Sequence, residues 1–300
     1  MQNLIVIAGP TAVGKTELAL EIAEHYGSEI ISADSRQVYR ELQIGTAAPT
    51  AQQLARVHHH LVGHRSISEY YSAYEFEQDV LKLLNGHFAK QNAVVMTGGS
   101  MMYIDAVCNG IDEIPTISDD VRNLVWQTYE KGGLEHMLKM LETLDPEFFS
   151  IVDKHNAKRV IHAVEICLMA GKPYSSLRTN SAKERPFNTI RIALNRDRAE
   201  LFERINMRVD QMMTDGLVDE ARKYYPMREL NSLNTVGYKE LFDYFDGNIP
   251  LEEAVRLIKR NTRRYAKKQL TWFRLKNDYQ WFEPNQKEAI IEYIDKSLKQ

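Results

Sequence analysis

A glycine-rich loop near the N-terminus constrains the fold of this chain more than any other sequence feature. A strand predicted at 3–8, apolar from Leu4 onward, precedes the loop, and a helical pattern over 17–26 follows it. The loop fits the pattern G-x-x-x-x-G-K-[ST] with the residues Gly9, Pro10, Thr11, Ala12, Val13, Gly14, Lys15 and Thr16. A strand, this loop and a helix in that order open a βαβ unit and predict an α/β fold with a P-loop NTPase-like parallel sheet.

The same loop predicts a binding site for a polyphosphate group. Its glycines let backbone N–H groups converge on an anion, and the following helix adds the positive end of its dipole. Lys15 supplies a point charge, and the Thr16 hydroxyl is a suitable ligand for Mg²⁺. We therefore expect Mg²⁺ as a cofactor, with Thr16 as its protein ligand.

The rest of the chain alternates strand and helix patterns around one purely helical stretch. We predict strands at 29–33, 93–97 and 189–194, a helix at 74–88, and only helical structure after Arg198. Between 118 and 178 the pattern is helical throughout. The predicted organisation is a P-loop core begun by 1–117, a helical insertion domain at 118–178, and completion of the core with basic C-terminal helices over 179–300.

Composition excludes several protein classes. With 300 residues, 44% of them hydrophobic, the chain can bury a core without disulfide bonds. Its two cysteines, Cys108 and Cys167, form neither a disulfide framework nor a four-ligand zinc site by themselves. No basic segment precedes the first apolar stretch, and no apolar run approaches the length of a membrane span. We expect a cytoplasmic protein without a membrane-spanning segment.

The loop lacks the acidic partner that most P-loop enzymes carry at the end of a neighbouring strand. The strand predicted at 93–97 leads into Gly98, Gly99 and Ser100 instead. The nearest carboxylate is Asp34, which follows the strand predicted at 29–33 and would face the loop, because the carboxyl ends of parallel strands line one crevice. Asp34 is interpreted either as a turn-forming residue or as a base beside a bound diphosphate.

Six segments together resemble the tRNA dimethylallyltransferases, also called IPP transferases. Besides the P-loop they are Ser32-Ala-Asp-Ser-Arg-Gln-Val-Tyr39, Ile44-Gly-Thr-Ala47 with Pro49, Gly98-Gly-Ser100 with Tyr103, Thr235-Val-Gly-Tyr-Lys239 and Lys268-Gln-Leu-Thr-Trp-Phe-Arg274. The resemblance implies transfer of a dimethylallyl group from dimethylallyl diphosphate to the exocyclic amine of the adenosine 3′-adjacent to the anticodon, in tRNAs that read codons beginning with U. Diphosphate is released, and no phosphoryl group moves.

The resemblance also implies roles for individual residues. Lys15 and Thr16 are catalytic within a diphosphate-binding loop, and Asp34 is the catalytic base. The insertion binds the anticodon stem-loop of the tRNA, and the enzyme is expected to be a monomer. Together with the basic C-terminal segment described below, the resemblance predicts these tRNA-binding residues: Asp34, Ser35, Arg36, Gln37, Ser100, Arg122, Lys158, Arg159, His162, Lys267, Lys268, Gln269 and Arg274.

Four positions depart from the family pattern. His162 stands where the family usually has an arginine, so a cation that titrates near neutrality replaces a permanent one. Asn234 stands where an arginine or glutamine is frequent, and Ala48 replaces a lysine. Ser100 replaces a threonine and keeps its hydroxyl. These differences concern single tRNA contacts rather than the reaction.

A basic segment lies near the C-terminus, although the net charge of the chain is −3. Residues 254–277 contain nine Lys or Arg residues and no carboxylate. These cations recur every three or four residues, which predicts a basic helical face that is either solvated or binds phosphates of the tRNA, and the proposed RNA substrate favours the second. The residues predicted to pack inward are Val255, Ile258, Tyr265 and Ala266.

Other conspicuous residues receive structural interpretations. His58, His59, His60 and His64 have no acidic or cysteine partner at matching spacing, so we do not expect a zinc site there. Trp272 and Phe273 are predicted to belong to the core, and Arg191 and Arg196 to the surface.

Two alternative functions remain: a P-loop small-molecule kinase and an RNA-binding P-loop protein without catalytic activity.

Overall fold

The computed structural model describes residues 2–89, 91–179 and 182–299, and it divides into two compact units. One unit consists of 1–109 and 184–300, and the other of 110–183. The helical insertion expected at 118–178 lies within the second unit. The first unit contains every strand of the described residues, so the sheet and the glycine-rich loop belong to it.

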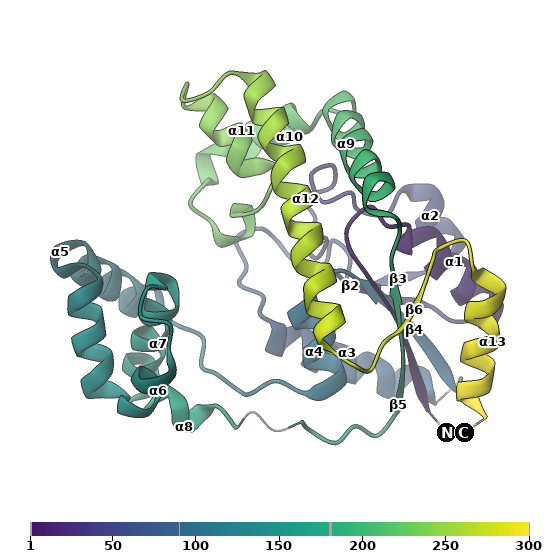
Figure 1. Ribbon diagram of the computed structural model, residues 1–300, viewed down its shortest axis with the longest axis horizontal. Coiled ribbons are helices and arrows are strands. Elements are labelled where there is room, and N and C mark those ends of the chain that lie inside the picture. Colours follow the sequence, from purple (N-terminus) through teal and green to yellow (C-terminus); the bar gives the residue numbers. More distant parts are fainter. Residues whose placement is uncertain (1, 90, 180–181, 300) are drawn as a thin grey trace. The chain divides into compact units, whose positions relative to one another are not determined.

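The first unit is built on a six-stranded sheet whose strands are all parallel (Figure 1). Their order is β3-β2-β4-β1-β5-β6. The strands predicted at 3–8, 29–33, 93–97 and 189–194 are confirmed. The six strands are β1 (Asn3–Ala8), β2 (Ile30–Ala33), β3 (His59–His60), β4 (Ala93–Gly98), β5 (Asn188–Leu194) and β6 (Gln280–Phe282).

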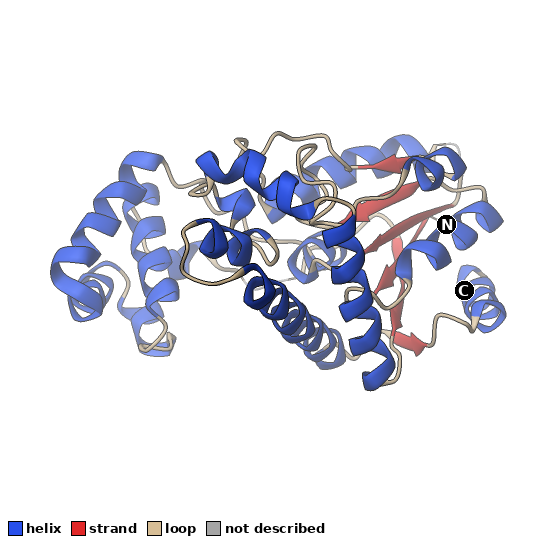
Figure 2. Cartoon of the chain, turned by 90° about the horizontal axis from the view of Figure 1, so that it is seen from above, coloured by secondary structure: helices blue, strands red, loops and turns tan. Residues whose placement is uncertain are grey.

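Helices cover both faces of this sheet (Figure 2), which explains why β1 is buried along its whole length. Val6 belongs to a core cluster with residues of α3 and α4, whereas Ile7 belongs to a second cluster with residues of α1, α9 and α13. The helices of this unit are α1 (Lys15–Tyr26), α2 (Ala51–Arg56), α3 (Ala73–Phe88), α4 (Met101–Asn109), α9 (Arg198–Thr214), α10 (Leu217–Tyr224), α11 (Tyr238–Phe245), α12 (Leu251–Leu275) and α13 (Lys287–Leu298).

Two short edge strands were missed in the sequence. The prediction of purely helical structure after Arg198 is wrong, because Gln280–Phe282 pairs with Ile192–Leu194 as β6. On the opposite edge, His59–His60 pairs with β2 as β3. Strands of two or three residues are too short to show a period of two, so only pairing with a longer neighbour reveals them.

The carboxyl ends of the central strands meet at one edge of the sheet, where ligands bind in open parallel sheets. The glycine-rich loop follows β1, Asp34 follows β2, and Gly99 with Ser100 follows β4. The long helix α12 runs close to α9 in this unit (Figure 1), and side chains from both helices reach the loop.

The second unit contains helices and connecting loops, with no strand among its described residues. Its helices are α5 (Asp119–Leu144), α6 (Pro146–Ile151), α7 (Ala157–Ala170) and α8 (Tyr174–Leu177). It has its own apolar core, in which Met137 and Leu141 of α5 pack with Val160 and Val164 of α7. Gly133 interrupts α5 with a positive φ of 65°, a conformation that glycine adopts readily. Across the described residues of both units, no helix is both long and apolar enough to cross a bilayer.

Candidate active site

The glycine-rich loop is held in a shape that only glycine allows at its first position. Gly9 has a φ of +151°, and a Cβ atom there would lie 2.9 Å from the carbonyl oxygen of Leu194. At the other end of the loop, Gly14 is the N-cap of α1 and provides no side-chain cap. The first N–H groups of α1 therefore remain available for an anion.

A cavity of about 390 Å³ lies against this end of the loop. Lys15 and Thr16 line it from α1, and Arg204 and Arg208 line it from α9. Three cationic side chains and a helix N-terminus thus surround one space, which suits a group with several negative charges. The sequence identified Lys15 and Thr16 but missed both arginines, because nothing in the local pattern of α9 connects it with the loop.

The Lys15 side chain is hydrogen-bonded to two backbone carbonyls of the loop. Its Nζ atom donates to the oxygens of Gly9 at 3.0 Å and Pro10 at 2.8 Å. Removal of the ammonium group from water and the nearby Arg208 cation lower the pKa of Lys15 to about 7, while the Asp34 carboxylate acts in the opposite direction. A bound anion would therefore stabilise the charged form of Lys15.

Two arginines brace the loop from outside. The Nε atom of Arg196 donates to the carbonyl oxygen of Val13 at 2.7 Å, and that of Arg204 donates to Ala12 at 2.9 Å. The prediction that Arg196 is a surface residue is wrong, because it contacts the loop. Arg191 is also largely buried and pairs with Asp278 and Asn109. By occupying the carbonyls, Arg196 and Arg204 fix the direction of the loop's peptide groups.

Gln269 of α12 links the loop to the end of β4. Its Oε1 accepts a hydrogen bond from Thr11 N at 2.9 Å, and its Nε2 donates to Gly99 O at 2.8 Å. The side chain is only 2% exposed. This geometry corrects the expectation that Gln269 contacts tRNA, because both ends of its amide are already hydrogen-bonded inside the protein.

Asp34 combines the two interpretations that the sequence left open. Its Oδ1 atom accepts hydrogen bonds from the backbone N–H groups of Arg36 at 2.9 Å and Gln37 at 3.2 Å, as in an Asx turn. Its Oδ2 atom has no hydrogen-bond partner among the residues that the structure describes. Asp34 also lines a cavity of about 820 Å³. One carboxylate oxygen therefore shapes the turn, and the other is available to a ligand.

The residues that follow Asp34 are positioned by their neighbours. The hydroxyl oxygen of Ser100 accepts a hydrogen bond from Ser35 N at 2.7 Å, and Ser100 is only 7% exposed. Arg36 lines the larger cavity and donates to the carbonyls of Asn231 and Ser232. Gln37 donates to the carbonyls of Thr46 and Ala47. Ser100 and Gln37 thus support the turn, and their contacts with tRNA remain predictions.

No carboxylate fits at the end of β4 without a change of backbone. A Cβ atom on Gly98 would lie 2.1 Å from the carbonyl oxygen of Ala33 in the adjacent strand. Any side chain at this position would therefore push β2 and β4 apart. This close approach explains in physical terms why the sequence has no acidic residue there.

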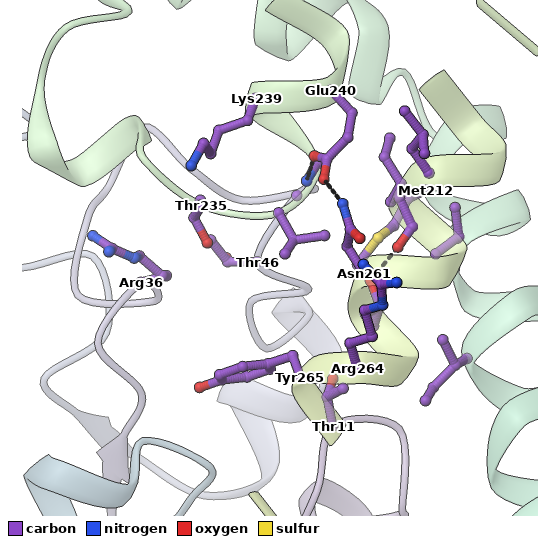
Figure 3. A pocket seen from close by; sticks show the side chains of 18 of the residues that line it. Thr11, Arg36, Thr46, Met212, Thr235, Lys239, Glu240, Asn261, Arg264 and Tyr265 are labelled. Carbon is purple, nitrogen blue, oxygen red and sulfur yellow. Dashed lines mark hydrogen bonds between the residues drawn. The ribbon is translucent and has the colours of Figure 1, made fainter. Parts of the chain in front are cut away.

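The larger cavity is bounded by several parts of the first unit (Figure 3). Thr11 and Asp34 lie on the sheet side, Arg208 on α9, and Tyr265 on α12. Figure 3 shows Arg36 and Tyr265 on one side of the space and Asn261 and Arg264 on the other. Arg208 lines this cavity as well as the smaller one, so the two cavities adjoin at its side chain. Asn234, one of the departures from the family pattern, also lines the larger cavity.

Tyr265 was predicted to pack inward, and the structure corrects this. Its exposed fraction is 36%, and it forms part of the cavity wall. Ile258 and Ala266 are buried as predicted, and Phe273 is fully buried. Partial removal from water and the nearby Asp34 carboxylate raise the pKa of Tyr265 to about 12, so its hydroxyl keeps its proton at neutral pH.

The cations of α12 occupy two flanks rather than one face. Arg260, Arg264 and Lys268 recur every four residues and line the larger cavity. Lys259 and Lys267 face α9, where they contact Asp210 and the ring of Phe202. The prediction of a single basic face is therefore wrong, and Arg260 and Arg264 join the candidate residues. Arg274 lies over the ring of Trp281, near the end of the helix.

The remaining candidate tRNA-binding residues belong to the second unit. Arg122 lies on α5 with 39% of its side chain exposed, 3.8 Å from Asp119. Lys158 and Arg159 are exposed at the start of α7. His162 is more than half exposed, and its Nδ1 atom lies 3.6 Å from Glu165. All four side chains are accessible on this unit, and their role in binding remains a prediction.

Comparison with known proteins identifies relatives along the whole chain. The sequence model described as IPP transferase matches residues 37–276. A tRNA dimethylallyltransferase 2 of Parabacteroides distasonis is 57% identical over 298 residues, which is 99% of this chain and 100% of that protein. The crystal structure of a tRNA isopentenylpyrophosphate transferase from Bacillus halodurans has a TM-score of 0.74 and 36% identity, and it covers 100% of this chain and 97% of the other.

A more distant solved structure shares the fold. It is a eukaryotic dimethylallyltransferase described as acting on tRNA, with a TM-score of 0.78 and 24% identity. The match covers 95% of this chain and 74% of that one.

The electrostatics of the loop lead to a prediction for Lys15. In ¹³Cε-labelled protein the Lys15 resonance should titrate near pH 7, and Mg²⁺ with inorganic diphosphate should move this midpoint upward by about 1 unit or more, because an adjacent anion favours the ammonium form. Loss of the Lys15 proton above pH 7 should therefore weaken diphosphate binding. The Lys15→Arg variant identifies the resonance, and a midpoint near 10 without ligand would contradict the prediction.

Proposed function

The chain belongs to the IPP transferase family, and on this premise we propose that it transfers a dimethylallyl group from dimethylallyl diphosphate to tRNA. The acceptor is the exocyclic amine of the adenosine 3′-adjacent to the anticodon, in tRNAs that read codons beginning with U. One observation carries the proposal: a carboxylate with an open oxygen lies in a cavity that adjoins a cationic P-loop cavity. The two cavities provide separate places for the acceptor base and the departing diphosphate.

The diphosphate would bind in the smaller cavity. The N–H groups at the start of α1 point to that space, and Lys15, Arg204 and Arg208 supply positive charge. The reaction breaks the bond between the allylic carbon and oxygen, and the electron pair leaves with the diphosphate. Positive groups that are fixed in advance stabilise the charge as it develops.

The residues around Thr16 fit a magnesium ion. Thr16 lines the smaller cavity beside Lys15 and offers a hard oxygen ligand. Mg²⁺ typically retains several waters and uses few protein ligands when a polyphosphate supplies the others, so the lack of a carboxylate after β4 is compatible with it. When bound, the ion would neutralise part of the charge on the diphosphate.

The target adenine would leave its base stack and enter the larger cavity, as in other enzymes that modify bases. Its exocyclic nitrogen forms the new bond to the allylic carbon, and its proton passes to the free Oδ2 atom of Asp34. The other oxygen keeps the turn in place through Arg36 and Gln37. Tyr265 and Arg36 border the same space and are placed to contact the base or its phosphates.

Recognition of the RNA would involve both units of a monomeric enzyme. Arg260, Arg264 and Lys268 form a basic row along the larger cavity and would contact phosphates near the target. Arg122, Lys158, Arg159 and His162 would contact the anticodon stem-loop from the second unit. The alternative functions considered above, a small-molecule kinase and a catalytically inactive RNA-binding protein, have no comparable support from relatives.

The reaction itself has a direct test. Unmodified tRNA incubated with the protein, Mg²⁺ and dimethylallyl diphosphate should yield adenosine that carries one prenyl group, detected by mass spectrometry of the nucleosides. Parallel reactions with ATP or GTP should show no phosphoryl transfer. Bound but unmodified tRNA, or a phosphorylated product, would support one of the alternatives instead.

For Asp34, the informative change is Asp34→Asn. The amide keeps an oxygen for the turn but cannot take the proton, so kcat should fall by about 10² or more, with little change in diphosphate affinity. The change Asp34→Ala removes the turn contacts as well. Asp243→Asn is the matched control, because Asp243 lines the same cavity away from the strand ends. Equal turnover in the Asp34→Asn variant and the wild type would refute the role.

The two flanks of α12 predict unequal effects of charge reversal. Lys268→Glu should raise the KM for tRNA by about tenfold, because Lys268 lines the cavity. It should also reduce the slope of log affinity against log salt concentration by about 1. Lys267→Glu should have a smaller effect, because Lys267 faces Phe202. Measurements of tRNA affinity over a range of salt concentrations distinguish the two. A larger effect at position 267 would contradict the proposed binding surface.

A further inference from the structure

A cluster of metal-binding side chains lies at the end of β2 opposite to Asp34. Glu29 immediately precedes β2, His60 belongs to β3, and His87 lies in the last turn of α3. One ligand atom from each of the three residues lies within 4.8 Å of the other two. The cluster is therefore separate from the proposed catalytic cavities, which adjoin the residues after the carboxyl ends of the strands.

The backbone explains why these residues converge. Ile31 of β2 is the register partner of His60 in β3. Glu29 is two residues before Ile31, so its side chain projects to the same face of the sheet. Helix α3 packs on that face, because its residues Val80 and Leu84 share a core cluster with Ile31. The last turn of α3 then brings His87 to the pair formed by Glu29 and His60.

The distances are close to those of a metal site. The Nε2 atoms of His60 and His87 are 3.1 Å apart, and the Oε2 atom of Glu29 lies 2.5 Å from the first and 3.5 Å from the second. Tetrahedral zinc with ligands at about 2.0–2.2 Å requires ligand atoms roughly 3.3–3.5 Å apart. Only the contact between Glu29 and His60 has to widen appreciably, and the Glu29 side chain is 44% exposed.

The chemistry of the cluster favours a cation at its centre. The Nε2 atoms of His60 and His87 lie against each other, and both lie close to the Glu29 carboxylate. Two imidazole nitrogens and a carboxylate oxygen this close together form a donor set that suits zinc.

We propose that Glu29, His60 and His87 bind one zinc ion, with a water molecule as the fourth ligand. The histidine side chains are 17% and 18% exposed, so solvent has access to the open position. The ion would connect β2, β3 and the end of α3. Since β3 is an edge strand of only two residues, such a connection would stabilise the edge of the sheet. Its role would be structural rather than catalytic.

The test is zinc binding by the full-length protein without a polyhistidine tag. After removal of metals by a chelator, calorimetric titration should show one zinc ion per chain with a Kd of about 1 µM or tighter. Saturating zinc should raise the Tm by roughly 3–8 °C. Cobalt substitution should give the visible absorption of a low-coordinate site with nitrogen and oxygen ligands.

Two ligand variants and one control locate the site. His87→Gln and Glu29→Gln should each weaken zinc binding by at least about tenfold and abolish the rise in Tm. His155→Gln removes an exposed histidine from the second unit and should leave both unchanged. Circular dichroism verifies that all variants are folded. Absence of stoichiometric binding, or unchanged binding in the folded His87→Gln protein, would show that the cluster is only a hydrogen-bonded group and would overturn the proposal.

Discussion

The hydrogen bonds that hold the P-loop from outside are the constraint on which the rest of the site depends. Gln269 fixes Thr11, and Arg196 and Arg204 occupy the carbonyls of Val13 and Ala12. Since these carbonyls are satisfied elsewhere, the N–H groups at the start of α1 remain directed to the cavity. The same glutamine also holds Gly99, so the ends of β1 and β4 are fixed together. A loop that bound a diphosphate without this support would first have to become ordered.

This arrangement concentrates charge before a substrate binds. Burial and the nearby Arg208 cation lower the pKa of Lys15, and burial also lowers the pKa of Arg208, whereas Asp34 opposes both changes. Positive groups held in this way gain most from an anion with several charges. The same charged groups take part in the proposed reaction. Negative charge would develop on the diphosphate on one side of Arg208, and a proton would move to Asp34 on the other side. Arg208 would thus lie between the proposed leaving group and the proposed base, because it lines both cavities.

Much of the fold was predictable because it is encoded locally. Four of the six strands, the P-loop and the helical stretch at 118–178 followed from patterns of neighbouring residues. The missed strands β3 and β6 are too short to carry such a pattern. The cations of α12 were recognised by their spacing, but spacing alone did not reveal that Lys267 faces α9 and Lys268 the cavity. Helical periodicity gives a residue's angle around its own helix, not the neighbour that it meets.

The sequence by itself determined the type of sheet, the anion-binding loop, the position of Asp34 at the end of a strand, and the family resemblance. Each of these depends on residues that are close together in the chain. Only the tertiary structure decided that Arg208 and Tyr265 line the cavity of Asp34, that Gln269 is a buried brace, and that Glu29 meets His60 and His87. These contacts join segments far apart in the sequence, and no local periodicity records them, because they exist only once the helices have packed on the sheet.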